Sequence, residues 1–131
     1  MALCVLNLKA GKAEFAGANN PLCLIRDNKL TTIKGDRFPI GAFEGAQQQL
    51  FANKEIDLLE NDSLYLFSDG YADQFGGPEN KKFMYRRFEA LLMEIHNLPM
   101  EAQKETLRTR LQEWRGDNDQ VDDILVIGIK I

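Results

Sequence analysis

The spacing of apolar residues changes once along this chain, and this change limits which folds the chain can form. In the first half, short apolar runs separated by turn-forming residues predict β-strands. In the second half, apolar residues recur at helical spacing and predict helices over residues 80–96 and from Pro99 to Gly116. The last ten residues return to a strand-like, β-branched pattern. The predicted strands cover residues 2–9, 13–18, 21–26, 29–34, 50–58, 63–68 and 122–131.

This order of several strands, two helices and one strand predicts an α+β fold. We expect mostly antiparallel β-sheet layers with the two helices packed on one face. The 131 residues suit a single domain, 1–131, that buries roughly two thirds of its unfolded surface. Gly11 and the pair Asp27–Asn28 predict hairpin turns. Residues 35–49, which contain Pro39 and three glycines, predict an irregular connection.

Composition excludes several classes of protein. The net charge of −4 and the pI near 5.0 argue against a nucleic-acid-binding surface. No apolar stretch of about 18 residues and no signal-peptide pattern occurs, so we expect no membrane segment and a cytoplasmic protein. Cys4 and Cys23 lie in apolar runs and are expected to be buried thiols rather than a disulfide or a metal pair. His96 is the only histidine, which argues against zinc and predicts a surface or helix-capping residue.

Three aspartates stand at the ends of apolar strands. Asp69 directly follows the strand predicted over residues 63–68, where an ionised side chain is costly unless something compensates its charge. Asp122 and Asp123 open the last predicted strand. If these strands pair antiparallel, the carboxylates meet at one rim of the sheet, and Mg²⁺ or Mn²⁺ would relieve their mutual repulsion. The spacing alone fits metal ligands and ordinary turn residues, and both interpretations stay open.

Segments on both sides of Asp69 resemble one protein family. NDSLYLFSDGYADQFGG (61–77), followed by the helix pair and VDDILVIGI (121–129), resembles the C-terminal half of the metal-dependent PPM-type serine/threonine phosphatases. More narrowly, it resembles their bacterial SpoIIE-like branch, which includes the phosphatases that regulate sigma-B. FAGANNPLCLIRDNKL (15–30) is similar to the family's Ala-Gly-His-Asn-Pro hairpin, and FPIG (38–41) is similar to its Pro-Leu-Gly. These ordered matches span nearly the whole chain.

The resemblance implies a binuclear Mn²⁺ or Mg²⁺ centre in the complete domain, acting on phosphoserine or phosphothreonine of a phosphorylated regulatory protein in sigma-factor signalling. Asp69 falls on the aspartate of the family's Thr-Asp-Gly motif and Asp122 on the first aspartate of its Asp-Asp motif, so both are implied to be catalytic metal ligands. Asp123 is a third candidate ligand, although it would point away from Asp122 in a strand. Gly70 would let the backbone turn beside the ion, and Asp73 would support the ligands from outside.

The chain also departs from the family pattern. Ser68 replaces the Thr before Asp69, Leu125 replaces the Thr after Asp-Asp-Ile, and Ala18 replaces the hairpin His. Nothing in residues 1–15 matches the family's Gly-Asp and Asp-Gly segments, which supply the aspartate that bridges both metals. We therefore expect residues 1–131 to be the C-terminal portion of a phosphatase domain, with weak Mn²⁺ binding and no useful activity alone.

Two alternatives follow from these departures. An open sheet edge, left by missing strands, would favour a homodimer. If the fold is kept without the chemistry, the chain is a non-catalytic interaction module instead of part of an enzyme.

Three further features have simple structural interpretations. Asp62 is expected to be a turn residue, and Trp114 a core residue. The basic cluster KKFMYRR (81–87) fits a solvated helix face, or alternatively a docking patch for an acidic phosphoprotein.

Overall fold

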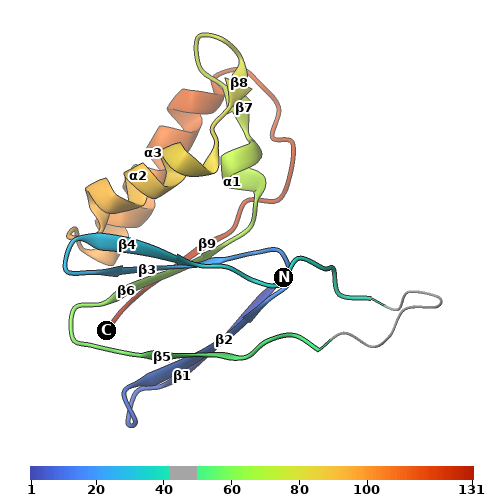
Figure 1. The fold of residues 1–131 in the computed structure, drawn as a ribbon. Coiled ribbons are helices and arrows are strands. Elements are labelled where there is room, and N and C mark those ends of the chain that lie inside the picture. The colour runs from blue at the N-terminus through green and yellow to red at the C-terminus, as the bar shows by residue number, and fades with distance from the viewer. Residues whose placement is uncertain (42–49) are drawn as a thin grey trace.

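The computed structural model describes residues 1–41 and 50–131, which form two stacked antiparallel β-sheets with helices on one outer face (Figure 1). The first sheet has the strand order β1-β2-β5, and the second has the order β4-β3-β6-β9. The strands of the first sheet are β1 (Ala2–Asn7), β2 (Lys12–Gly17) and β5 (Lys54–Asp57). Those of the second are β3 (Leu22–Arg26), β4 (Lys29–Ile33), β6 (Ser63–Phe67) and β9 (Val126–Lys130). The predicted α+β class and its antiparallel layers are confirmed.

The remaining elements lie on the side of the second sheet that faces away from the first (Figure 1). Helices α2 (Tyr85–Ile95) and α3 (Met100–Arg115) cover this sheet. A short helix, α1 (Gly70–Asp73), and a small hairpin of β7 (Phe75–Gly76) and β8 (Lys81–Lys82) connect β6 to α2. None of the helices in the described ranges is long and apolar enough to cross a membrane.

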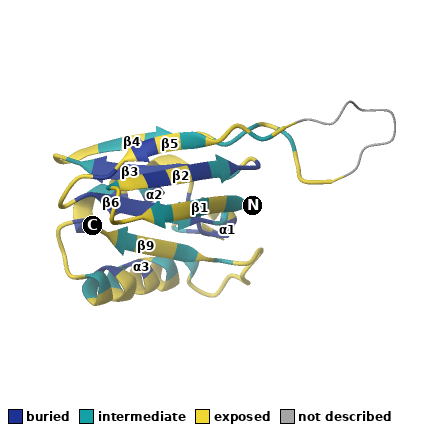
Figure 2. Ribbon diagram, turned by 90° about the horizontal axis from the view of Figure 1, so that it is seen from below, coloured by how far each residue is buried: buried dark blue, intermediate teal, exposed yellow. Residues whose placement is uncertain are grey.

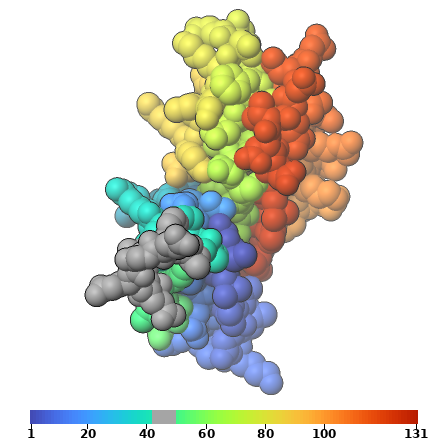
Figure 3. All heavy atoms as spheres, turned by 90° about the vertical axis from the view of Figure 1, so that its right-hand side faces the viewer, coloured from blue at the N-terminus to red at the C-terminus, as the bar shows by residue number. Residues whose placement is uncertain are grey.

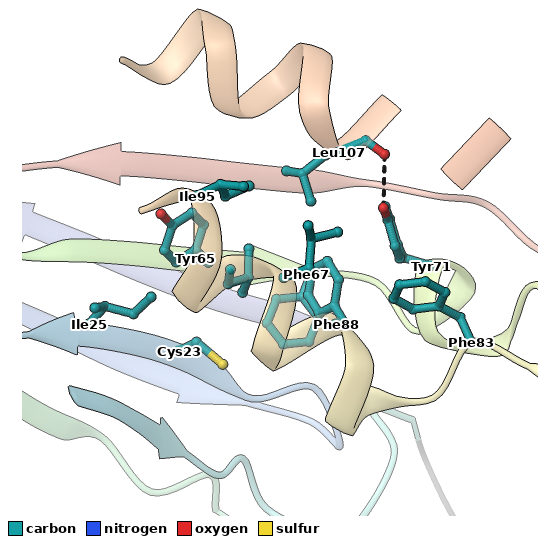
Figure 4. Close-up of a cluster of buried hydrophobic side chains, with 11 residues drawn as sticks. Cys23, Ile25, Tyr65, Phe67, Tyr71, Phe83, Phe88, Ile95 and Leu107 are labelled. Carbon is teal, nitrogen blue, oxygen red and sulfur yellow. Dashed lines mark hydrogen bonds between the residues drawn. The ribbon is translucent and has the colours of Figure 1, made fainter. Parts of the chain in front are cut away.

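Two separate hydrophobic cores hold these layers together. Between the sheets, Phe15, Leu24 and Leu64 are buried in one cluster, and buried residues alternate with exposed ones along β2 (Figure 2). Between the second sheet and the helices, Tyr65 and Phe67 belong to the other cluster (Figure 4). Leu64 and Tyr65 are adjacent in β6, so the alternation of side chains places β6 at the centre of both cores.

Most predicted strands and turns are present. Asp27 and Asn28 have φ values of +49° and +55°, as a two-residue type I′ hairpin requires. The predicted strand over residues 50–58 is reduced to β5, and residues 42–49 of the predicted irregular connection lie outside the described residues.

The predicted start of the first helix, at residue 80, is wrong. Residues 81–82 form β8, and α2 begins only at Tyr85. Met84 has a φ of +76°, which an α-helix cannot contain. Its N–H donates to the carbonyl of Ala72 at 2.7 Å, and the N–H of Phe83 donates to the carbonyl of Gln74 at 2.9 Å. Bonds to the segment after Asp69 therefore override the helical spacing of the sequence.

The second helix and the final strand also differ from prediction at their starts. Pro99 caps α3 from the position before its first helical residue, and Gly116, with φ +56°, ends it as predicted. The strand predicted over 122–131 begins only at Val126. Asp122 and Asp123 therefore lie in a loop, where the alternation of strand side chains does not apply. Strand geometry therefore does not direct the Asp123 side chain away from Asp122.

Three predictions for single residues are answered by their surroundings. Both cysteines are free thiols as predicted, although Cys4 is only partly buried while Cys23 is fully buried. His96 is 6% exposed, so the prediction of a surface position is wrong. Its ring contacts the Met93 carbonyl at 2.8 Å, a capping contact at the end of α2, and Asn28 Oδ1 at 3.0 Å. Trp114 is half-buried and packs against the core beneath the helices.

Candidate metal-binding site

The antiparallel pairing of β6 with β9 brings the predicted site segments to one rim of the second sheet. Phe67 at the end of β6 pairs with Val126 at the start of β9. The chain therefore leaves β6 toward Asp69 at the place where it enters β9 from Asp122. In Figure 3 the yellow-green segment that follows β6 lies directly against the red segment that leads into β9.

Ser68 bonds these two segments together. Its N–H donates to the Leu125 carbonyl at 3.0 Å, and its hydroxyl donates to the Asp123 carbonyl at 2.7 Å. The same hydroxyl accepts a hydrogen bond from the Leu125 N–H at 2.9 Å. The Ser that replaces the family's Thr therefore keeps the hydroxyl, which here both donates and accepts a hydrogen bond between the two segments.

Gly70 allows these segments to approach closely. A Cβ atom at this position would lie 2.3 Å from the Asp123 carbonyl oxygen, so no other residue fits without a backbone shift. Gly70 is the first residue of α1 and is not among the glycines with positive φ. The sequence predicted a sharp turn at Gly70. The structure shows a different reason for the glycine, which is contact with the backbone beside Asp122.

The three candidate carboxylates are exposed at this rim. Asp69 begins α1 but makes no side-chain bond to cap it, so its carboxylate is not used by its own helix. One oxygen of Asp122 accepts the N–H of Asp123 at 2.7 Å. In the described ranges, none of Asp69, Asp122 and Asp123 forms a salt bridge.

Asp73 lies one helical turn after Asp69, and its N–H donates to the Asp69 carbonyl at 2.9 Å. Its carboxylate forms an ion pair with Lys82 of β8 at 3.1 Å. Burial raises the pKa of the Tyr85 hydroxyl, and the negative charges of Asp69 and Asp73 raise this pKa further. The charges of both carboxylates therefore raise the pKa of the same tyrosine, which is 40% exposed at the start of α2.

Three of the basic side chains in the cluster 81–87 contact other residues of this chain. Lys81 pairs with Glu79, Lys82 pairs with Asp73, and the Arg87 guanidinium lies 4.5 Å from the centre of the Trp114 ring. Only Tyr85 to Arg87 lie on a helix, because Lys81 and Lys82 form β8. The predicted helix face therefore covers only part of the cluster, and the docking patch stays a prediction.

Gln74 is a site-adjacent residue that sequence reasoning missed. It follows α1 directly and is fully buried. Its side-chain amide donates to the Asp119 carbonyl at 2.9 Å and to the Phe75 carbonyl at 3.1 Å. Its backbone carbonyl accepts a bond from the Trp114 indole N–H at 3.1 Å. A glutamine in a polar loop carries no sequence signal of such burial.

The carboxylates are suitable donors for Mg²⁺ or Mn²⁺, because both ions prefer oxygen ligands. These carboxylates are too few to fill a coordination shell, since Mg²⁺ takes about six oxygen ligands. Over residues 1–41 and 50–131, no group of three or more His, Cys, Asp or Glu side chains comes together as a metal site. The residues fit one part of a coordination shell, and the rim does not supply the whole shell.

The sequence model of Stage II sporulation protein E (SpoIIE) matches residues 1–131. The chain belongs to the SpoIIE family. The fold of this SpoIIE-family chain is similar to that of the SiaA-PP2C domain of Pseudomonas aeruginosa, with a TM-score of 0.89 and 28% identity over 99% of this chain and 50% of that one. No curated protein sequence matches the chain.

Two further solved structures share the fold at lower identity. The phosphatase domain of the cell fate determinant SpoIIE from Bacillus subtilis has a TM-score of 0.66 and 14% identity over 100% of this chain and 57% of that one. RsbX in complex with magnesium has a TM-score of 0.57 and 12% identity over 97% and 53%. The SpoIIE-family chain thus has the fold of PP2C phosphatase domains and spans about half the length of each of these three structures.

Proposed function

We propose that this SpoIIE-family chain is part of a metal-dependent phosphatase that removes phosphate from phosphoserine or phosphothreonine of a regulatory protein, as in sigma-factor regulation. The observation that carries the proposal is the locked contact between the Asp69 and Asp122 segments. Ser68 bonds to both Asp123 and Leu125, and Gly70 lies against the Asp123 carbonyl. Two strand ends with exposed carboxylates are thereby held together at one rim.

In this proposal Asp69 and Asp122 hold Mn²⁺ or Mg²⁺, and Asp123 is the third candidate ligand. When bound, the ions supply positive charge that neutralises phosphoryl oxygens and activates an attacking water. The chain's own contribution is to hold two carboxylates close to the joined ends of β6 and β9, so that little reorganisation accompanies binding. The remaining ligands would come from other parts of the domain, because this rim offers only two or three carboxylates.

The test uses the intact protein with Mn²⁺ and a phosphoserine or phosphothreonine peptide as substrate. We expect Asp69→Asn and Asp122→Asn each to abolish Mn²⁺-dependent phosphate release, because each removes a negatively charged ligand. The matched control is Asp117→Asn, which changes an exposed aspartate of the same loop region. Full activity of both site variants would show that the assigned roles are wrong.

The alternative function, a non-catalytic interaction module, is favoured by two departures at this end of the fold. Leu125 is 56% exposed where the resembling family has Thr, and Ala18 is buried where it has His. An intact wild-type protein that folds but neither binds Mn²⁺ nor releases phosphate would support the module.

A further inference from the structure

Two polar side chains tie the Asp69 segment to the Asp122 segment, one before Asp69 and one after it. Ser68 precedes Asp69 and bonds to the backbone just after Asp122. Gln74 follows α1 and bonds to the carbonyl of Asp119, just before Asp122. The two carboxylates therefore lie between two cross-links, which we call the Ser68 link and the Gln74 link.

The Ser68 link stands where the regular pairing of β6 and β9 ends. The last paired residues are Phe67 and Val126, and the Ser68 N–H still donates to the Leu125 carbonyl. The return bond from the Leu125 N–H goes to the Ser68 hydroxyl at 2.9 Å. A side chain thus takes the place of a backbone acceptor. This exchange lets the backbone turn into α1 while the two strand ends stay joined.

The Gln74 link is closed off from solvent. Gln74 is 0% exposed, and its amide N–H groups are used by two backbone carbonyls. The Trp114 indole N–H donates to the backbone carbonyl of Gln74, and the Gly77 N–H donates to the backbone carbonyl of Trp114 at 2.8 Å. A Cβ atom on Gly77 would lie 2.6 Å from the Trp114 ring, so the indole packs directly on this loop. The amide nitrogen of Gln74 is satisfied by its two bonds, whereas the side-chain oxygen Oε1 is buried and has no hydrogen-bond partner in the described ranges. The two bonds from the nitrogen therefore orient this side chain.

Because like charges repel, carboxylates brought to one rim tend to separate when no cation lies between them. We propose that Ser68 and Gln74 are positioning residues that fix Asp69 relative to Asp122 for divalent cation binding. This inference rests on the proposed function, because it assumes that these two aspartates are ligands. Residues that orient ligands from outside typically change metal affinity by about 10–100-fold when they are replaced.

The chain offers a matched control for the Ser68 link. Ser63 lies at the opposite end of β6, pairs with Lys130 of β9, and its hydroxyl accepts a bond from the Lys130 ammonium at 3.1 Å. Ser63→Ala therefore removes a side-chain bond between the same two strands, but at the end far from the carboxylates. Ser68→Thr keeps the hydroxyl and serves as the conservative variant.

The experiment measures binding of Mn²⁺ alone to the intact protein by isothermal titration calorimetry, with the melting temperature recorded for each variant. We expect Ser68→Ala to weaken Mn²⁺ binding by about tenfold or more, while Ser68→Thr and Ser63→Ala bind as the wild type does. Gln74→Met, which keeps the side-chain volume, should weaken binding in the same direction as Ser68→Ala.

Wild-type affinity in Ser68→Ala would overturn the inference. An equal loss in Ser63→Ala would also overturn it, because general loosening of the β6–β9 pair would then explain the effect. Mn²⁺ binding that Asp69→Asn and Asp122→Asn leave unchanged would instead refute the proposed ligands, whatever the Ser68 variants do.

Discussion

Replacing Arg26 should destabilise this chain more than replacing any of its exposed lysines that form ion pairs. Asp62 closes a turn as predicted, because its N–H donates to the Leu59 carbonyl at 3.1 Å. It is also 1% exposed and forms an ion pair with Arg26, which the sequence did not indicate. Its two oxygens accept bonds from Arg26 Nε at 2.8 Å and Nη2 at 2.6 Å, and one also accepts the Leu59 N–H at 2.9 Å. The pair joins β3 to the turn before β6, so it connects segments 36 residues apart.

Arg26→Met would leave the Asp62 carboxylate buried without its cationic partner. Removing one member of a buried ion pair costs about 3–5 kcal/mol. The Arg26 side chain is 31% exposed, so water can partly replace it, and we expect a loss of about 3 kcal/mol in the free energy of unfolding. The control is Lys12→Met, which breaks the Lys12–Glu55 pair whose side chains are 52% and 68% exposed. That change should cost about 0–1 kcal/mol.

Urea titration of this chain and its two variants measures both values. The pH dependence adds an independent check. Burial alone would raise the pKa of Asp62, but the bonds from Arg26 and Leu59 and the charges of Arg26 and Lys130 outweigh it and lower this pKa. The stabilisation by Asp62 is therefore complete above its unfolded pKa of about 3.9 and disappears as the pH falls through the lower folded pKa. Equal losses in Arg26→Met and Lys12→Met at pH 7, or an unchanged acid limb in Arg26→Met, would refute this reasoning.

Two other predictions concern the rim and the open sheet edges. Gly70→Ala should lower the free energy of unfolding by about 1–3 kcal/mol and weaken Mn²⁺ binding by the intact protein, because its Cβ would meet the Asp123 carbonyl. The control is Gly41→Ala, where no atom of residues 1–41 or 50–131 lies within 4 Å of the added Cβ. A fully stable Gly70→Ala protein would contradict the stated contact. In the described ranges β1 pairs only with β2 and β9 only with β6, and Val5 is 55% exposed, so residues 1–131 alone should self-associate through an edge strand. Light scattering after size exclusion under reducing conditions should show a concentration-dependent dimer that Val5→Lys weakens, and a monomer at every concentration would exclude this edge pairing.

Sequence reasoning succeeded where a local pattern decides the structure and failed where distant contacts decide it. The strands β1 to β4 and β6 follow from apolar spacing and turn residues, because each side chain only needs to be on the correct face. The start of α2 does not follow, because Phe83 fits helical spacing but packs edge-on against Tyr71 and Trp114. The turn at Asp62 was predicted correctly, but its ion pair was not, because Arg26 is 36 residues away in the sequence.

The candidate site shows the same division. The positions of Asp69 and Asp122 at the ends of paired strands could be predicted, because antiparallel pairing requires their segments to meet. The hydrogen bonds that join these two segments could not be predicted, because they come from the hydroxyl of Ser68 and from Gln74, which belongs to no recognisable sequence motif. Burial of Gln74 depends on Trp114 and Asp119, which are 40 and 45 residues away.

The two halves of the rim are supported unequally, and this explains why the side-chain links matter. Asp69 follows β6, which is paired on both sides and buried in both cores. Asp122 precedes β9, whose described pairing is on one side only. The position of Asp69 is thus set by rigid packing, whereas that of Asp122 depends on its attachment to β6 and to Gln74. A perturbation at the β9 edge should therefore displace Asp122 before it displaces Asp69. The loop that carries Asp122 is attached nearby through the Ser68 and Gln74 links, whereas Asp69 follows a strand that is paired on both sides.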